Sequence, residues 1–314
     1  MDEDNRFANL SSSEDEFSSM SSDEESSHIS NEESSQHEDY DDEFIQAFGK
    51  STGITDQCRA DIFEIKNNHP GHFPHRYNWK SFDLSNYNAD RFSNHAWELL
   101  GQYIANNDKL WSLSINFGAD KSLVDSRTSF LFRGLVKSSS VKYVSLNNCG
   151  IGVDGIRSMA PFLENTSNLS SLDMTNNNLN AEGFEVLMSA LDRGPIVDLF
   201  LRGCNIEDIS ILRNCTFPRI QYLRLSNNNI GTHGCVAIAN LLQKDESCLR
   251  NLQLSSCGID DEGAEILANS LKRNNTLTSL YLARNEIKEK GSIAFLKLLN
   301  DVSSIENTYN SNTL

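Results

Sequence analysis

Hydrophobic residues recur along the chain with a regular spacing from residue 141 onward. Six successive segments begin with a hydrophobic residue, and their starts lie 28, 27, 24, 29 and 28 residues apart. The six starts are Val141, Leu169, Ile196, Ile220, Leu249 and Leu277. In every segment, further hydrophobic residues stand three, five and ten positions after the start. The alternation at positions three and five predicts a short β-strand with one buried face in each segment.

In the second half of five segments, the hydrophobic residues stand four positions apart. In the segment that starts at Leu249, Gly263 stands fourteen positions in, and Leu267 and Leu271 follow at intervals of four. This spacing is typical of one face of an amphipathic helix. Each unit is therefore predicted to be a strand, a loop and a helix. Two weaker units, which start at Trp79 and Leu110, precede the regular ones.

Two units depart from this pattern. The unit at Ile196 is only 24 residues long, lacks the glycine and the helical stripe, and contains Pro218. Because proline disrupts a helix interior, we expect only a short helical turn there. A ninth unit begins at Ile305, but Thr308 and Asn310 replace the expected hydrophobic residues. A terminal repeat needs a polar outer surface, so 305–314 is predicted to be a minimal C-terminal cap.

The consensus LxxLxLxxNxIxxxGxxxLxxxL resembles a leucine-rich repeat of the ribonuclease-inhibitor type, which also occurs in NOD-like receptors and Ran GTPase-activating proteins. The resemblance covers 79–304 in about eight units and is regular from 141. It implies an α/β fold, a curved leucine-rich-repeat solenoid with parallel strands on the concave face and helices on the convex face.

The eighth position of each regular unit alternates strictly between cysteine and asparagine. The residues are Cys149, Asn177, Cys204, Asn228, Cys257 and Asn285. An inward asparagine can bond the N–H and C=O groups of adjacent turns, and a thiol is a small hydrophobic group and a weak donor. These six residues are therefore predicted to be structural. The carboxylates that follow Cys257 are predicted to start a helix, with Asp260 as its N-cap, rather than to bind a metal.

Residues 1–43 differ sharply in composition from the rest of the chain. They contain 16 Asp and Glu residues and one basic residue, a net charge of -15 out of -17 for the whole chain. So few hydrophobic residues predict a disordered acidic tail. Four serines have an acidic residue three positions later, the spacing that casein kinase 2-type kinases favour; these candidate phosphorylation sites are Ser13, Ser22, Ser30 and Ser35. A solvated tail without a switch role is the alternative interpretation.

Residues 44–78 are predicted to be an N-terminal capping or transition segment. Within it, His69, His72 and His75 are three residues apart, a spacing that raises the question of a zinc site. The two prolines in HPGHFPH break any helix that would align these histidines on one face. A polar capping loop is therefore favoured over a metal site, and no metal is predicted elsewhere.

The exposed strand positions of the repeats are the candidate protein-binding residues. They are Tyr143, Asp173, Asp198, Phe200, Arg202, Tyr222, Arg224, Gln253, Tyr281 and Arg284. Aromatic residues and arginine are enriched at binding hot spots, and repeat proteins use their concave surfaces for binding. Aromatic residues also occur on sheets for cross-strand packing alone, so this alternative stays open.

The sequence shows no glycine-rich phosphate loop, nucleophile elbow or paired zinc spacing. We therefore expect no enzyme activity and no cofactor, and predict a non-catalytic protein–protein interaction module. Activation of a small GTPase, implied by the Ran GTPase-activating resemblance, is the alternative. The acidic tail and a net charge of only -2 after residue 43 oppose nucleic-acid binding.

The start of the sequence lacks the pattern of a secretory signal, and no apolar run reaches the length of a membrane span. The expected location is therefore the cytoplasm, with the nucleus as the alternative. In either compartment the seven cysteines should stay reduced. We expect a monomer that does not bind membranes.

Overall fold

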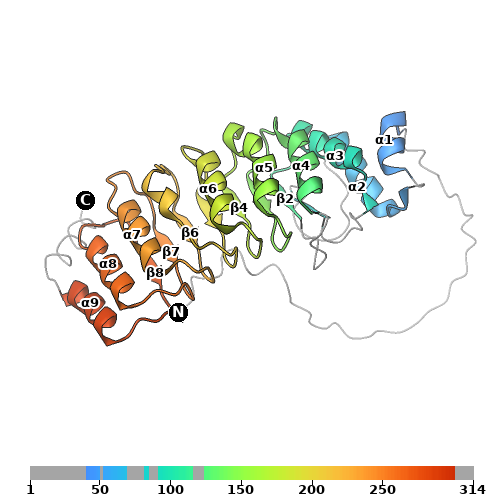
Figure 1. The fold of residues 1–314 in the computed structure, drawn as a ribbon. Helices are drawn as coiled ribbons and strands as arrows, with labels where there is room; N and C mark the ends of the chain where they lie inside the picture. Colours follow the sequence, from blue (N-terminus) through green and yellow to red (C-terminus); the bar gives the residue numbers. More distant parts are fainter. Residues whose placement is uncertain (1–39, 50–51, 69–80, 85–90, 116–123, 301–314) are drawn as a thin grey trace, which may run out of the picture. The chain divides into compact units, whose positions relative to one another are not determined.

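One parallel β-sheet runs through the part of the chain that the structure describes. This computed structural model describes residues 40–49, 52–68, 81–84, 91–115 and 124–300. Within them, the strands pair in chain order from β1 to β8 (Figure 1). The strands are β1 Ser81–Asp83, β2 Ser112–Ser114, β3 Tyr143–Ser145, β4 Ser171–Asp173, β5 Asp198–Phe200, β6 Tyr222–Arg224, β7 Asn251–Gln253 and β8 Ser279–Tyr281. Each strand lies at the predicted alternating positions, so the strand prediction is confirmed.

The strand register builds the hydrophobic core. The middle residue of each strand pairs with the middle residue of the next, as Leu199 does with Leu223. From β1 to β7 these middle side chains are at most 2% exposed. A slip of one residue would turn the leucines to the opposite face of the sheet, so burial of the leucines specifies the register.

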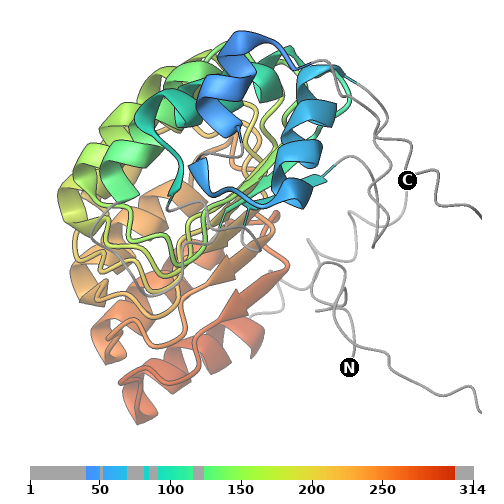
Figure 2. The same cartoon turned by 90° about the vertical axis from the view of Figure 1, so that its right-hand side faces the viewer.

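A layer of helices packs on one side of this sheet (Figure 2). The helices are α3 Asn94–Asn106, α4 Val124–Leu135, α5 Val153–Asn165, α6 Asn180–Leu191, α7 Gly231–Leu242, α8 Asp261–Leu271 and α9 Glu289–Asn300. Each follows a strand, and its apolar stripe faces the core, as Leu267 of α8 does at 0% exposure. The strand, loop and helix order and the α/β solenoid fold class are confirmed.

The short repeat after β5 has a 3₁₀ turn, η5, in place of an α-helix. It spans Ser210–Arg213, which confirms the predicted short helical turn ahead of Pro218. Lys244 Nζ, from the neighbouring repeat, donates to the carbonyl of Arg213 at the end of this turn and to that of Cys215 just after it. The helix layer is interrupted at this repeat alone among the repeats from β3 to β8.

The N-terminal segment forms two helices, α1 Asp42–Phe48 and α2 Asp56–Lys66. The acidic tail was predicted to extend to residue 43, but α1 already begins at Asp42. The side chain of Asp41 accepts the backbone N–H of Phe44 and caps the helix. Phe44, Ala47 and Phe48 form its buried stripe, so the last acidic residues of the predicted tail belong to the folded region.

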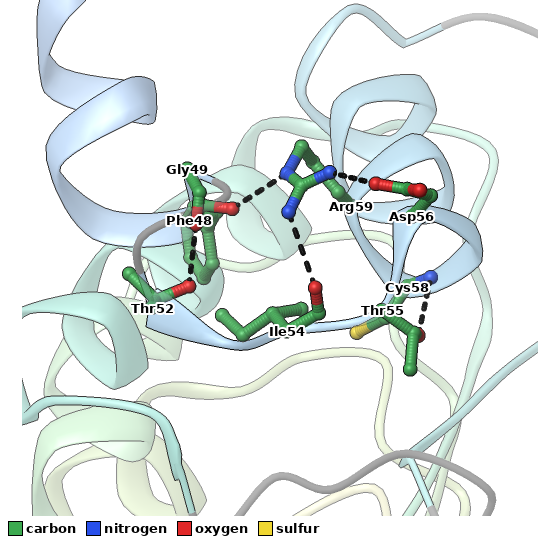
Figure 3. A network of polar contacts seen from close by, with 8 residues as sticks. All are labelled: Phe48, Gly49, Thr52, Ile54, Thr55, Asp56, Cys58 and Arg59. Atoms are coloured by element: carbon green, nitrogen blue, oxygen red, sulfur yellow. Dashed lines mark hydrogen bonds and ion pairs between the residues drawn. The ribbon is translucent and has the colours of Figure 1, made fainter.

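A buried arginine joins these two helices (Figure 3). Arg59 Nε donates to the backbone oxygen of Phe48 at 2.8 Å, and a terminal guanidinium nitrogen donates to that of Ile54 at 3.1 Å. The other terminal nitrogen pairs with the carboxylate of Asp56. The guanidinium thus satisfies two loop carbonyls that would otherwise be buried without a donor. The predicted loop at His69 to His75 and the four candidate phosphorylation sites lie outside the described residues.

A column of buried asparagines joins the regular repeats. Asn228 Oδ1 accepts the backbone N–H groups of Cys204 and Ile206 at 2.9 and 3.0 Å. Its Nδ2 donates to the carbonyls of Leu201 and Leu225, both at 2.8 Å. The same four bonds recur around the other two asparagines of the column, Asn177 and Asn285.

The cysteines of the column donate hydrogen bonds to the preceding repeat. Each thiol donates to a carbonyl of the preceding repeat, as Cys204 Sγ does to Met174 O at 3.1 Å and Cys257 Sγ to Leu225 O at 3.3 Å. Cys149 Sγ donates in the same way to Ile115 O. Burial raises the pKa of Cys204 to about 12, which keeps the proton that this bond needs.

The acidic run before α8 caps two helices. Asp260 is the N-cap of α8, as predicted, and its Oδ1 accepts the N–H of Gly263 at 2.9 Å and the hydroxyl of Thr232. Asp261 Oδ1 instead accepts the backbone N–H groups of Lys288 and Gly291, at the start of α9. Lys288 stands just before α9, and its side chain has no hydrogen-bond acceptor. The carboxylate of Asp261, from the neighbouring repeat, therefore caps α9.

The last described repeat is less buried than the inner ones. Leu280 and Leu282 are half-buried, although the same positions of the preceding repeat are fully buried. On α9, Leu296 and Leu299 are 55% and 67% exposed. The predicted cap, 305–314, lies outside the described residues.

We predict that Asn228→Ala lowers the free energy of unfolding by about 4 kcal/mol, because it leaves two N–H groups and two carbonyls buried without partners. Asn240→Ala, which removes an exposed helix-surface amide from α7, should change stability by no more than about 0.5 kcal/mol. Urea denaturation followed by circular dichroism measures both. Equal stabilities of the two variants would contradict the role of the column.

Asp260 should make a pH-dependent contribution to stability. The N–H of Gly263 and then the hydroxyl of Thr232 lower its pKa, so its stabilising contribution is present above its unfolded pKa of about 3.9 and is lost as the pH falls through the folded value. Urea denaturation of the wild type and Asp260→Asn should give a stability difference that is constant from about pH 7 to about pH 4.5 and shrinks below that. Glu262→Gln, in the same helical turn, is the matched control. A difference that grows in acid would refute the assignment.

Candidate binding surface

The sheet presents two rows of side chains on the surface opposite the helices, here called the strand face. Because side chains alternate along a strand, the first and third residues of each strand point away from the leucine core. The first row is Ser81, Ser112, Tyr143, Ser171, Asp198, Tyr222, Asn251 and Ser279. The second row is Asp83, Ser114, Ser145, Asp173, Phe200, Arg224, Gln253 and Tyr281.

Eight of the ten predicted binding residues lie in these rows. They are Tyr143, Asp173, Asp198, Phe200, Tyr222, Arg224, Gln253 and Tyr281. The other two, Arg202 and Arg284, are exposed in the loops that follow β5 and β8. The sequence prediction left out Asn251, which stands in the first row, and the exposed Arg250 beside it. Asn251 occupies the same position in its repeat as Tyr222, so the repeat spacing alone could have identified it as a strand-face residue.

The N-terminal part of the strand face carries mostly small polar side chains. Ser81 Oγ donates to Ser112 Oγ at 3.2 Å across β1 and β2. Asp173 accepts the backbone N–H of Thr175 at 2.9 Å, which closes a local turn. Burial, and then the nearby charge of Asp173, raise the pKa of Tyr143. These polar groups largely satisfy one another within the protein.

The centre of the strand face holds a stacked arginine. The guanidinium of Arg224, on β6, lies over the ring of Phe200, on β5, with Cζ 4.4 Å from the ring centroid. This is a cation–π contact, which fixes the position of the charge. Tyr222 lies in the adjacent row and is 37% exposed. The predicted residues Phe200, Tyr222 and Arg224 therefore lie together on two neighbouring strands.

Three polar atoms around this stack have no hydrogen-bond partner within the described residues. They are Asp198 Oδ1, Arg224 Nε and Asn251 Oδ1, on the three consecutive strands β5, β6 and β7. Burial raises the pKa of the Asp198 carboxyl, and the charge of Arg224 opposes part of that rise. Buried polar groups in proteins are nearly always bonded, so three unbonded ones on neighbouring strands are unusual.

Arg284 stands at a position with a left-handed backbone. The seventh position of each regular repeat has a left-handed backbone, with φ between 55° and 64°. In the first five repeats this position holds Asn148, Asn176, Gly203, Asn227 and Ser256. Arg284, like Ser256 one repeat earlier, adopts this conformation at a cost that glycine and asparagine largely avoid.

The described residues contain no cluster of His, Cys, Asp or Glu side chains able to hold a metal ion. None of the helices in the described part is long and apolar enough to cross a membrane. None of the seven cysteines is assigned to a disulfide, and six are buried. Burial raises the pKa of Cys58 and Cys235 to about 12, and that of Cys215 and Cys257 to about 11. These buried thiols are therefore poor nucleophiles.

Comparison with known proteins finds a family model that matches several of the repeats. Five segments match a family model described as leucine-rich repeat, and these are residues 137–160, 166–188, 220–239, 247–268 and 273–296. They coincide with the five strand and helix units that begin at β3, β4, β6, β7 and β8. The short repeat of β5 is not among the matched residues.

Curated relatives match the chain over part of their length. Ribonuclease inhibitor of Mus musculus is 26% identical over 175 residues, which are 54% of this chain and 38% of that protein. Centrosomal protein of 78 kDa of Homo sapiens is 29% identical over 167 residues, 51% of this chain and 23% of that protein. NACHT, LRR and PYD domains-containing protein 14 of Homo sapiens is 26% identical over 230 residues, 70% of this chain and 20% of that protein. The chain thus spans less than half the length of each.

Solved structures align with lower scores. An internalin, inlF, of Listeria monocytogenes has a TM-score of 0.42 and 19% identity, covering 63% of this chain and 55% of its own. The tropomodulin C-terminal domain of Caenorhabditis elegans has a TM-score of 0.31 and 12% identity, covering 70% and 97%. Neither alignment bears on what the strand face binds.

We predict that one thiol reacts rapidly with Ellman's reagent at neutral pH in the folded protein, because only Cys248 is exposed. All seven should react after unfolding in guanidinium chloride. Cys248→Ser should remove the rapid phase, and Cys149→Ser should leave it unchanged. Rapid reaction of more than one thiol before unfolding would show that the repeat column is open to solvent.

Proposed function

We propose that this chain, a leucine-rich-repeat protein of the ribonuclease-inhibitor type, binds a protein partner through the strand face at β5, β6 and β7. Repeats of this kind suggest a protein–protein interaction module and typically serve as non-enzymatic scaffolds. They present an extended surface whose residues vary while the core stays the same. Within the strand face, the part at β5, β6 and β7 departs most in composition from small polar residues.

The unbonded polar atoms around the Phe200–Arg224 stack support this proposal most directly. A buried polar atom without a partner costs about 1–3 kcal/mol, and a bound protein that supplies the missing bond recovers that cost. The stack also holds the guanidinium in place before binding, so little side-chain entropy remains to be lost. Tyr222 adds an exposed aromatic group next to it.

The helix side offers a contrasting surface. Arg157 of α5 pairs with Asp154 and with Glu182 of α6, and Lys290 of α9 pairs with Glu265 of α8. These charges are matched within the protein and remain hydrated. Exposed pairs of this kind contribute little, about 0–1 kcal/mol each. The helix side is therefore the natural control surface for a binding experiment.

Activation of a small GTPase remains an alternative that rests on resemblance alone. No described residue favours it over other protein partners. A monomeric state, a cytoplasmic or nuclear location and the absence of nucleic-acid and membrane partners stay predictions from the sequence.

Photo-crosslinking can test the strand-face proposal. Benzoylphenylalanine in place of Tyr222 should crosslink a partner protein in a cell extract, because this side chain lies beside the stack and is exposed. The same amino acid in place of Glu185, exposed on α6, is the control and should give no such product.

The captured partner can then be tested for affinity. Phe200→Ala together with Arg224→Ala should weaken its binding at least about 30-fold, because truncation of a hot-spot residue costs about 2 kcal/mol or more. Arg157→Ala should bind like the wild type. Circular dichroism verifies that the double variant is folded. The proposal is wrong if position 185 captures the partner as well as position 222 does, or if the double variant keeps full affinity.

A further inference from the structure

The strand-face positions of the repeats from β5 to β8 carry an excess of positive charge. These positions are the first, second, fourth, sixth and seventh of each repeat, counted from its start. They hold four arginines, Arg202, Arg224, Arg250 and Arg284, and one acidic residue, Asp198. The same positions of the β3 and β4 repeats hold one lysine and one aspartate. The excess is therefore confined to the C-terminal half of the strand face.

The four arginines form no ion pair within the described residues, since the pairs of this protein lie elsewhere. Three of them are exposed, and Arg224 is held over Phe200. Arg284 has a left-handed backbone. Guanidinium groups form strong, often bidentate hydrogen bonds with carboxylates and phosphates. A ligand for this half must therefore carry several negatively charged oxygens.

The unbonded acceptors narrow the choice of ligand. Asp198 and Asn251 each have a buried oxygen without a donor, on either side of the strand that bears Arg224. Both side chains are only half-buried, so a rotation about their side-chain bonds can turn these oxygens toward a ligand. A polypeptide carries a backbone N–H at almost every residue, so it can supply these donors together with acidic side chains. The sugar–phosphate backbone of a nucleic acid supplies the charge but few donors. Asp198 would also repel its phosphates.

We propose that the β5–β8 half of the strand face binds an acidic, extended peptide segment of its partner protein. Carboxylates of the segment pair with the four arginines, and its backbone N–H groups bond to Asp198 and Asn251. Apolar side chains of the segment contact Phe200, Tyr222 and Tyr281. This inference rests on the proposed function, because it specifies the chemistry of a partner at the same surface.

Three fluorescein-labelled probes test it by fluorescence anisotropy with the full chain. The first is an acidic peptide of three copies of Glu-Leu-Glu-Tyr, the second replaces each Glu by Gln, and the third is an oligouridine RNA of matched length. The acidic peptide should bind at least about tenfold more tightly than the other two at about 0.05 M NaCl, and its affinity should fall at about 0.3 M, because added salt screens exposed charges. Equal binding of the glutamine peptide, or tighter binding of the RNA, overturns the proposal.

A matched pair of variants locates the binding. Arg224→Gln with Arg250→Gln should weaken the acidic peptide at least about tenfold, since two charge-assisted contacts are lost. Arg157→Gln with Arg273→Gln removes the same charge from exposed residues outside the strand face and should stay within about twofold, the effect of net charge alone. Equal losses in both pairs would show unspecific charge attraction and overturn the assignment.

The crosslinking experiment separates this inference from the function on which it rests. If a partner crosslinks at position 222 but the crosslinked segment is not acidic, the strand face binds proteins and the acidic-segment proposal is wrong. If nothing crosslinks at position 222, both proposals fail.

Discussion

The buried asparagine column is the interaction on which the rest of the fold depends. Each asparagine bonds four backbone groups at the place where the chain leaves the strand, and for Asn228 three of these belong to the preceding repeat. Without it these groups would be buried and unpaired. The bonds also hold one repeat at a fixed offset from the next. The strand register from β1 to β8 aligns the two rows of the strand face.

Cysteine can alternate with asparagine because the two side chains need different groups. The asparagine accepts two N–H groups and donates twice, whereas the thiol of Cys204 donates once, to Met174 O. That carbonyl also accepts Asn177 Nδ2, so one oxygen serves both side chains. The column is therefore continuous although only every second repeat supplies an amide. The column thus accounts for three of the seven cysteines, Cys149, Cys204 and Cys257.

The sequence could predict strands, helices and the cap at Asp260 because each depends on spacing within one repeat. It could not predict that Asp261 caps α9, since that bond joins two repeats and depends on the distance between their helix starts. The acidic tail was predicted to extend to residue 43, because the acidic composition masked the N-cap at Asp41. On the strand face, position alone identified Phe200 and Arg224. Their stacking and the unbonded oxygens depend on side-chain orientations across strands, which spacing does not encode.

The protonation of Asp198 depends on whether its carboxyl has a hydrogen-bond donor. A carboxyl that is half-buried without a donor has a raised pKa, because burial disfavours the charged form more than Arg224 favours it. The fold itself does not need a carboxyl at this position, because the paired position of the preceding strand is occupied by Ser171. Burial without a donor makes the charged form of this carboxyl unfavourable in the free protein. A backbone N–H from a partner would stabilise the charged form, so partner binding and deprotonation of Asp198 must favour each other.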